Sequence, residues 1–346
     1  MVPSIAARLR ANIVVSAHPL ALDAAGAIDQ RAQRALTRYY LDSGVHGLAV
    51  GVHTTQFDLH ADRGALAQIW ELAATEAADA SRDVMLIAGL TGDIDNAVAE
   101  AERAAQLGYE AVLLCPYGMS ERTEDTLIER ARAVGEILPT IGFYLQDSVG
   151  GMRLSPDYWK RLFDLESTVA VKAAPFDRYR TADVAQSLLS HDRWNDIALL
   201  TGNDDAIVHD LITPYRRTIG GVRREVRASG GLLGQWAVGA RAAVSLVHAV
   251  ADNLAADRVT SELLAAATDL VDINAAVFDV DNNFAGCVAG VNEVLRQQGL
   301  LTSSDCLGGS ERLSPGQSNR IAAVRQRYPE LLDEEFIAAH VDRWLA

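Results

Sequence analysis

The chain has 346 residues, of which 49% are hydrophobic and 22% are charged, a composition typical of globular proteins. The length suffices for one large domain or two ordinary ones, and no run approaches the ~18 uninterrupted apolar residues of a membrane span. The net charge of −15 argues against nucleic acid or an anionic membrane as a partner, because both are negatively charged.

The cysteines and the N-terminus give no sign of a metal site, of disulfide bonds or of export. Cys115, Cys287 and Cys306 are odd in number, and their spacing matches no zinc-binding pattern. The first residues, MVPSIAARLRANIVV, lack the apolar core and the cleavage site of a signal peptide. We therefore expect a cytoplasmic protein without a bound metal.

Short apolar runs rich in β-forming residues recur along the first 250 residues. They predict eight strands, at 13–17, 47–52, 84–90, 111–116, 140–146, 169–174, 197–203 and 231–235. The segments between them carry apolar residues three and four positions apart, which predicts helices, among them 29–43, 61–80, 94–106 and 124–138. Strands that alternate with helices pair in parallel, because each helix carries the chain back across the sheet.

Eight strand–helix units predict a (β/α)8 TIM barrel over residues 1–250. An open doubly wound sheet is the alternative, but no GxGxxG motif follows the first strand. The connection before the eighth strand, 211–231, is longer and more basic than the others. We expect an inserted helix or loop there, as a lid or an oligomer contact. From residue 251 onward only amphipathic helical patterns occur, so an all-helical extension packed on the barrel is expected over 251–346.

One charged residue interrupts the sixth predicted strand. Lys172 lies in the run VAVKAA, and a lysine is rarely buried unless it is paired or used. Inside a barrel the loss of hydration lowers the pKa of the amine, and a neutral amine can attack a ketone to form a Schiff base. The alternative is a structural lysine that reaches the rim or pairs with a carboxylate.

Other polar side chains follow the predicted strands at their C-terminal ends, where the active sites of such barrels lie. They are His53, Thr54, Thr55 and Gln56 after the second strand, Tyr144, Gln146, Asp147 and Ser148 at the fifth, Asn203, Asp204 and Asp205 at the seventh, and Gln235 and Trp236 at the eighth. Tyr144 could exchange protons with a Schiff base on Lys172, assisted by a threonine hydroxyl. Structural roles are the alternatives: a core aromatic residue for Tyr144, helix caps for the threonines, and turn residues for the aspartates.

Several stretches resemble the dihydrodipicolinate synthase / N-acetylneuraminate lyase superfamily of Schiff-base aldolases. The resemblance covers residues 13–250 and is strongest over 44–177. SGVHGLAVGVHTTQF is similar to the strand that ends in a Gly-Thr-Thr-Gly-Glu turn, and VMLIAGLTGD and AAQLGYEAVLLCPYG are similar to the third and fourth strands. IGFYLQDSVGGMRLS resembles the segment with the catalytic tyrosine, STVAVKAAPFD the strand with the imine-forming lysine, and LLTGNDD the turn after the seventh strand.

This resemblance implies a role for each matched residue. Lys172 would form the imine, Tyr144 would transfer protons, and Thr54 would relay them. Thr54 and Thr55 would hold the substrate carboxylate. The further substrate contacts that we expect are His53, Gln146, Asp147, Asn203 and, through its backbone, Leu233.

The sequence also departs from the synthase pattern. Val149 stands where the synthases have an arginine for their second substrate, and Gly118 where they have a second tyrosine. We therefore expect no dihydrodipicolinate synthesis. We expect a cofactor-free class I aldolase or lyase, acting on pyruvate or another 2-oxo acid and on an aldehyde or sugar fragment, in a homodimer or homotetramer. Two alternatives stay open: a 2-oxo sugar-acid dehydratase that uses the same imine, and a non-catalytic paralogue that binds a 2-oxo acid.

Overall fold

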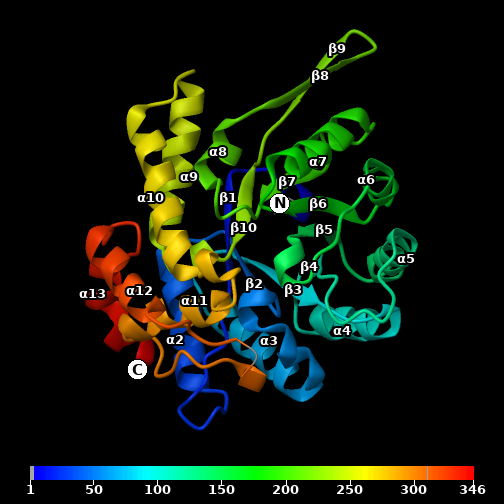
Figure 1. Ribbon diagram of the computed structural model, residues 1–346. Helices are drawn as coiled ribbons and strands as arrows, with labels where there is room; N and C mark the ends of the chain where they lie inside the picture. The colour runs from blue at the N-terminus through cyan, green and yellow to red at the C-terminus, as the bar shows by residue number, and fades with distance from the viewer. Residues whose placement is uncertain (1–3, 310) are drawn as a thin grey trace.

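The computed structural model describes residues 4–309 and 311–346. Its centre is a closed barrel of eight parallel strands in the order β1-β10-β7-β6-β5-β4-β3-β2 (Figure 1). The strands are β1 (Ile13–Ala17), β2 (Gly47–Val50), β3 (Met85–Leu90), β4 (Ala111–Leu114), β5 (Thr140–Leu145), β6 (Thr168–Ala174), β7 (Ala198–Thr201) and β10 (Gly230–Leu233). The predicted TIM barrel is confirmed, and the bounds of the predicted strands differ by at most two residues at either end.

Helices cover the outside of the barrel. They are α2 (Gln30–Ser43), α3 (Arg63–Ala78), α4 (Ile94–Gln106), α5 (Glu124–Gly135), α6 (Pro156–Phe163), α7 (Arg178–Ser190), α8 (Ile207–Ile212) and α9 (Ala240–Ala255). Local chemistry sets their ends, as α2 illustrates. The side chain of Asp29 accepts a hydrogen bond from the backbone N–H of Ala32 at its start. At its end Gly44 adopts a left-handed conformation with φ 89°.

Two apolar clusters divide the core. One fills the barrel interior and includes Ile87, Leu113, Phe143 and Leu200. It also contains Leu9 of α1 (Ile5–Leu9). The larger cluster lies between the strands and the surrounding helices. Because successive residues of a strand point to opposite faces, the cluster to which a side chain belongs tells which face of the barrel wall it occupies.

The insertion before the last barrel strand is a β-hairpin, so the expectation of a helix or loop there is wrong. Strands β8 (Tyr215–Ile219) and β9 (Val222–Val226) pair antiparallel around Gly220 and Gly221. Both glycines have positive φ, 56° and 80°, as a two-residue hairpin turn requires. The Gly-Gly pair between two short runs that begin or end in β-branched residues was the signal for this hairpin.

The C-terminal extension is all-helical in its described residues, as predicted. Its helices are α10 (Ser261–Val277), α11 (Cys287–Gln297), α12 (Gln317–Arg327) and α13 (Glu334–Leu345). They pack beside α2 and α8, and α11 contacts the turn after β2 (Figure 1). None of the helices in the described part of the chain combines the length and the apolar character needed to cross a membrane.

Candidate active site

Lys172 projects into the barrel interior near the C-terminal end of β6. It pairs with Phe143 on β5 and with Leu200 on β7, and only 9% of its surface is exposed. Its Nζ lies 4.4 Å from the centre of the Phe143 ring. Burial lowers the pKa of Lys172 from the usual 10.5 to about 8, while the charge of Asp204 acts in the opposite direction. A large fraction of this amine is therefore neutral near pH 8.

Gly202, directly after β7, provides the space for this side chain. A Cβ atom at position 202 would lie 2.5 Å from Cε of Lys172 and 2.7 Å from Cβ of Ala174. Both distances are far below van der Waals contact, so no side chain larger than that of glycine fits while the lysine keeps its position.

Replacing this glycine tests the position of the lysine. In Gly202→Ala we expect covalent trapping of a 2-oxo acid on Lys172 to slow by roughly 10–100-fold, because a small displacement of a reacting group is costly. The rate is measurable by mass spectrometry of borohydride-reduced samples. An unchanged rate would mean that Lys172 reacts from a different conformation.

Tyr144 lies on the opposite face of β5 from Phe143. Its ring belongs to the outer cluster, 5.3 Å from the ring of Trp159, and its hydroxyl accepts a hydrogen bond from the backbone N–H of Leu154 at 3.4 Å. Among residues 4–309 and 311–346, the hydrogen bond of the Tyr144 hydroxyl is to Leu154, and none joins it to Lys172. The aromatic residue beside the amine is Phe143, which has no proton to exchange.

Asp204 is a buried carboxyl group that interacts electrostatically with Lys172. It follows β7 and is 8% exposed, and its Oδ1 accepts a hydrogen bond from the backbone N–H of Gln235 at 3.0 Å. Its backbone carbonyl accepts a second one, from Nδ2 of Asn274 at 2.7 Å. Burial raises the pKa of Asp204 to about 7 against the opposing effects of Gln235 and Lys172. Asp204 is one of the polar residues predicted at the end of the seventh strand, but its position beside Lys172 depends on the loop after Thr201, where β7 ends.

The two threonines after β2 differ in their freedom to bind a ligand. The hydroxyl of Thr55 donates to the carbonyl of His18 at 2.6 Å and accepts from the N–H groups of Gly51 and Val52 at 2.9 and 3.2 Å. It is fully used in holding the turn. The hydroxyl of Thr54 is buried and has no hydrogen-bond partner among residues 4–309 and 311–346. Because an unsatisfied buried hydroxyl costs free energy, a polar ligand atom at Thr54 would be stabilising.

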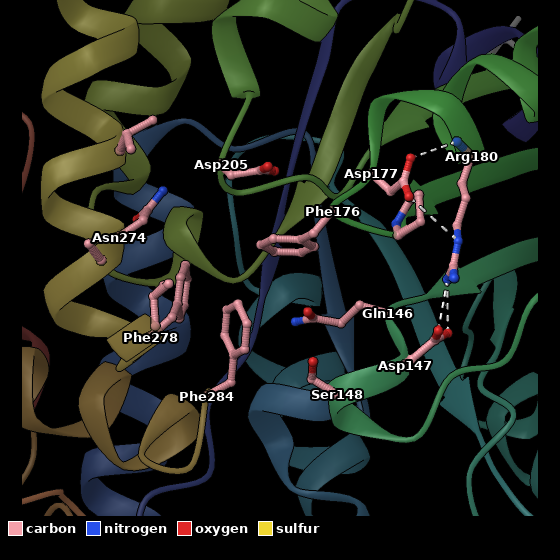
Figure 2. Close-up of a pocket in the computed structure, with 14 residues that line it drawn as sticks. Gln146, Asp147, Ser148, Phe176, Asp177, Arg180, Asp205, Asn274, Phe278 and Phe284 are labelled. Atoms are coloured by element: carbon pink, nitrogen blue, oxygen red, sulfur yellow. Dashed lines mark hydrogen bonds and ion pairs between the residues drawn. The ribbon is translucent and has the colours of Figure 1, made fainter. Parts of the chain in front are cut away.

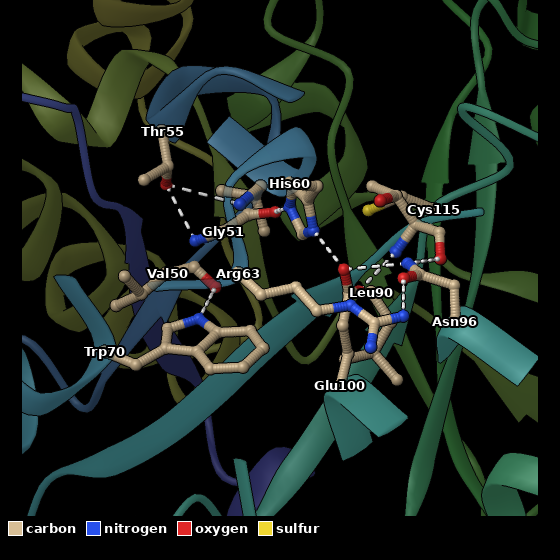
Figure 3. A network of polar contacts seen from close by, with 12 residues as sticks. Val50, Gly51, Thr55, His60, Arg63, Trp70, Leu90, Asn96, Glu100 and Cys115 are labelled. Carbon is tan, nitrogen blue, oxygen red and sulfur yellow. Dashed lines mark hydrogen bonds and ion pairs between the residues drawn. The ribbon is translucent and has the colours of Figure 1, made fainter. Parts of the chain in front are cut away.

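A network of buried polar contacts holds the turn after β2 in place (Figure 3). The imidazole of His60 bonds to the carboxylate of Glu100 and to the carbonyl of Gly51, both at 2.8 Å. Trp70 donates its indole N–H to the carbonyl of Val50 at 3.1 Å. On the other side, a Cβ atom at Gly89 would lie only 2.3 Å from the carbonyl oxygen of Gly51, so β3 approaches the turn closely. The position of the turn is thus fixed from both sides.

The C-terminal extension contributes residues to the mouth of the barrel, although no site residue was predicted in it. Nε2 of His53 lies 3.3 Å from a carboxylate oxygen of Glu311. The ring of Phe284 meets that of Phe176 edge-on, with 5.7 Å between their centres. Only the folded chain brings these segments together.

A cleft of about 470 Å³ opens at this end of the barrel, between the ends of β5 and β6 and helix α10 (Figure 2). Figure 2 shows Phe176 and Phe284 between Asn274 on one side and Gln146 on the other. Asp147 also lines the cleft, where its carboxylate bonds to Arg180 at 2.9 Å. The cleft therefore contains two of the expected substrate contacts, Gln146 and Asp147. Lys172 is not among its lining residues and lies deeper in the barrel.

Asn203 and Leu233 are the two remaining expected substrate contacts, and the side chain of Asn203 is used by the fold. The amide of Asn203 accepts from the N–H of Phe176 at 3.0 Å and donates to Asp210 at 2.9 Å and to Thr181 at 3.2 Å. The side chain of Leu233 is fully buried in the outer cluster, so the predicted contact through its backbone stays a prediction. Within the described residues, no group of three or more His, Cys, Asp or Glu side chains could hold a metal ion.

Comparisons with known proteins agree with this architecture. The sequence profile of the dihydrodipicolinate synthetase family matches residues 11–214. A search of curated proteins finds no match. Among solved structures, dihydrodipicolinate synthase from Oceanobacillus iheyensis is 17% identical, with a TM-score of 0.74 over 94% of this chain and 98% of that one.

Two further solved structures were determined with small molecules bound. N-acetylneuraminate lyase from Fusobacterium nucleatum, complexed with pyruvate, is 17% identical, with a TM-score of 0.72 over 94% of this chain and 98% of that one. CdNal from Clostridium difficile, in complex with mannosamine, is 18% identical, with a TM-score of 0.72 over 91% and 98%. At these identities the similarity shows a shared fold.

Proposed function

The chain belongs to the dihydrodipicolinate synthetase family, whose profile matches more than half of its length, and we propose that it is a lyase. In this proposal Lys172 forms a Schiff base with a 2-oxo acid. The observation that carries the proposal is the buried amine with its pKa near 8. The chain contains 29 arginines and only two lysines, Lys160 and Lys172. An arginine in this strand could not lose its proton, whereas a lysine can.

The chemistry begins with the neutral amine. Nζ of Lys172 attacks the C2 carbonyl of the 2-oxo acid, the carbinolamine loses water, and a protonated imine remains. Removal of a proton from C3 then gives an enamine, whose electron pair forms a bond to the carbonyl carbon of an aldehyde. In the reverse direction the same bond breaks, and water releases the 2-oxo acid from the lysine.

We propose Asp204 as the group that exchanges the C3 proton. Its pKa of about 7 suits a proton carrier at neutral pH, and its charge acts on Lys172. The thiol of Cys115 also acts on Lys172, but burial raises its pKa to about 12, so it stays protonated. Phe143 has no exchangeable proton, and the Tyr144 hydroxyl bonds to Leu154 on the outside of the barrel.

The turn after β2 is our candidate for the carboxylate of the 2-oxo acid. Two of its buried polar groups, the hydroxyl of Thr54 and the side-chain N–H2 of Gln56, have no hydrogen-bond partner in the described part of the chain. Both can donate to a carboxylate oxygen.

The cleft at the mouth is our candidate for the second fragment. Its lining includes three carboxylates, those of Asp147, Asp177 and Asp205, and one cation, Arg180, which pairs with the first two. Such a lining favours a fragment rich in hydroxyl groups and disfavours one with a second carboxylate. This agrees with the expectation that the chain does not synthesise dihydrodipicolinate.

The pH dependence of imine formation follows from the lowered pKa of Lys172. Only the neutral amine reacts, so we expect the trapping rate with pyruvate to fall about tenfold for each pH unit below ~8 and to level off above it. The measurement is the initial rate of adduct formation between pH 6 and 10. A rate that keeps rising toward pH 10.5 would show an amine with an ordinary pKa.

Exchange of the C3 protons of pyruvate into heavy water, followed by NMR, separates the proposal from a non-catalytic paralogue. A lyase of this kind exchanges these protons at a catalytic rate, whereas a paralogue that only binds 2-oxo acids does not. A 2-oxo sugar-acid dehydratase stays the second candidate, because it uses the same imine. Product analysis distinguishes the two, since a dehydratase keeps all carbons in one product and an aldolase yields two.

A further inference from the structure

Three basic side chains meet at the N-terminal end of the barrel, opposite the mouth, in a chain whose net charge is −15. They are His46, directly before β2, Arg82, in the loop before β3, and His248 on α9, and we call them the basic cluster. β2 and β3 are parallel neighbours, so their first residues lie at the same end of the barrel. The rings of His46 and His248 lie at 85° to each other, with 6.4 Å between their centres. Burial and the charges of Arg82 and His248 lower the pKa of His46.

The guanidinium of Arg82 is held in place but lacks a hydrogen-bond acceptor. Its Nη1 is buried and has no partner among residues 4–309 and 311–346. A Cβ atom at Gly44 would lie 3.7 Å from this nitrogen and 3.9 Å from Cγ1 of Val244, so Nη1 packs beside the end of α2, close to α9. A buried donor without an acceptor costs free energy, and an acceptor atom at this position would therefore be stabilising.

The two imidazoles add further donors to the basic cluster. Nδ1 of His46 accepts a hydrogen bond from the backbone N–H of Val14 at 3.1 Å, so Nε2 carries the proton of the neutral ring. Neither this Nε2 nor the ring of His248 forms a hydrogen bond with another residue in the described part of the chain. His248 is exposed, so the basic cluster is open to solvent on the side of α9.

No ion pair joins the basic cluster to a carboxylate within residues 4–309 and 311–346. The carboxylates nearest to it in the sequence are Asp42, Asp83 and Asp252. Asp42 and Asp83 pair with other arginines, and Asp252, one helical turn beyond His248, is exposed and forms no ion pair. The C-terminal end of α2 offers a partial negative charge of ~0.5, which favours one cation there. It leaves the buried nitrogen of the arginine without an acceptor.

We propose that the basic cluster binds a phosphate group, as inorganic phosphate or as the phosphoryl group of a small metabolite. The fork of a guanidinium matches two phosphate oxygens, and the imidazoles offer donors to the others from two further segments of the chain. A carboxylate has only two oxygens and would leave one of these donors unused. Active sites of such barrels lie at the mouth, so a ligand at the opposite end is an effector or a stabilising ion and not a substrate. The proposal does not depend on the chemistry of Lys172.

Isothermal titration calorimetry of the full chain with inorganic phosphate, at constant ionic strength, tests the proposal. We expect saturable binding in the wild type. Arg82→Gln is expected to weaken it by about 10–100-fold, because hydrogen bonds to a charged donor are lost. His248→Ala, on the exposed face of α9, is expected to weaken it by about 2–10-fold and leaves the test valid if Arg82→Gln fails to fold. The matched control is Arg258→Gln, the same change at an exposed arginine just beyond α9, which is expected to keep the wild-type affinity.

A titration with glycerol 3-phosphate distinguishes the two sources of the phosphate group. Tighter binding than that of inorganic phosphate, weakened by Arg82→Gln, would identify a phosphorylated metabolite as the ligand, and weaker binding would identify the free ion. A wild type that binds neither compound, or affinities that both Arg82→Gln and His248→Ala leave unchanged, would overturn the proposal. A melting temperature that phosphate raises equally in the wild type and in Arg82→Gln would also overturn it, because phosphate stabilises proteins non-specifically as well.

Discussion

Lys172→Met is expected to abolish covalent trapping of pyruvate and to lower turnover by at least about 10³-fold. Methionine fills a similar volume in the barrel but has no nucleophile. The fold is expected to stay intact, because the change removes an amine that burial disfavours in its charged form. Far-UV circular dichroism and the melting temperature check this expectation.

The chain offers a matched control for this variant. Lys160 is the only other lysine and lies exposed on α6, so Lys160→Ala is expected to keep full trapping and turnover. Turnover retained in Lys172→Met would mean that the reaction does not pass through this amine.

Asp204→Asn is expected to slow the exchange of the C3 protons of pyruvate by about 10²–10⁴-fold, because asparagine cannot take up the proton. The imine should still form when the reaction is given time to reach equilibrium, so the borohydride adduct on Lys172 persists. The charge of Asp204 raises the pKa of Lys172, and its removal is expected to shift the pH midpoint of adduct formation downward. NMR in heavy water measures the exchange, and the trapping rate against pH measures the shift.

Tyr144→Phe is the comparison for this experiment. Its hydroxyl accepts a single hydrogen bond from Leu154 outside the barrel interior, so the variant is expected to exchange C3 protons at nearly the wild-type rate. If Tyr144→Phe lost the exchange while Asp204→Asn kept it, the proton transfer would belong to Tyr144, and our assignment of Asp204 would be wrong.

The barrel and its lysine could be predicted from the sequence because both depend on local pattern. Eight apolar runs with helices between them leave few topologies, and a lysine within such a run is conspicuous. By contrast, the pattern could not predict which residue of β5, Phe143 or Tyr144, points into the barrel. In TIGFYLQ every residue is compatible with burial, and both faces of a parallel strand are buried, so no polar alternation distinguishes Phe143 from Tyr144. A shift of one residue in the assumed register would place Tyr144 inside the barrel and Phe143 outside.

Contacts between distant segments were equally inaccessible. Glu311 meets His53, and Phe284 meets Phe176, only because the extension folds back over the barrel mouth. The hydroxyl of Thr55 looked as free as that of Thr54. Only the structure shows that Thr55 is used by His18, Gly51 and Val52. By contrast, the hairpin was within reach of the sequence, since Gly220 and Gly221 separate two short β-forming runs.

Borohydride trapping with pyruvate, followed by peptide mass spectrometry, tests the central claim most directly. With only two lysines in the chain, the site of an adduct can be assigned without ambiguity. The account predicts a single reduced pyruvyl adduct on Lys172 and none on Lys160, and a panel of larger 2-oxo acids extends the test to other substrates. An adduct on neither lysine with any 2-oxo acid would contradict the account and leave Lys172 a structural residue of the barrel.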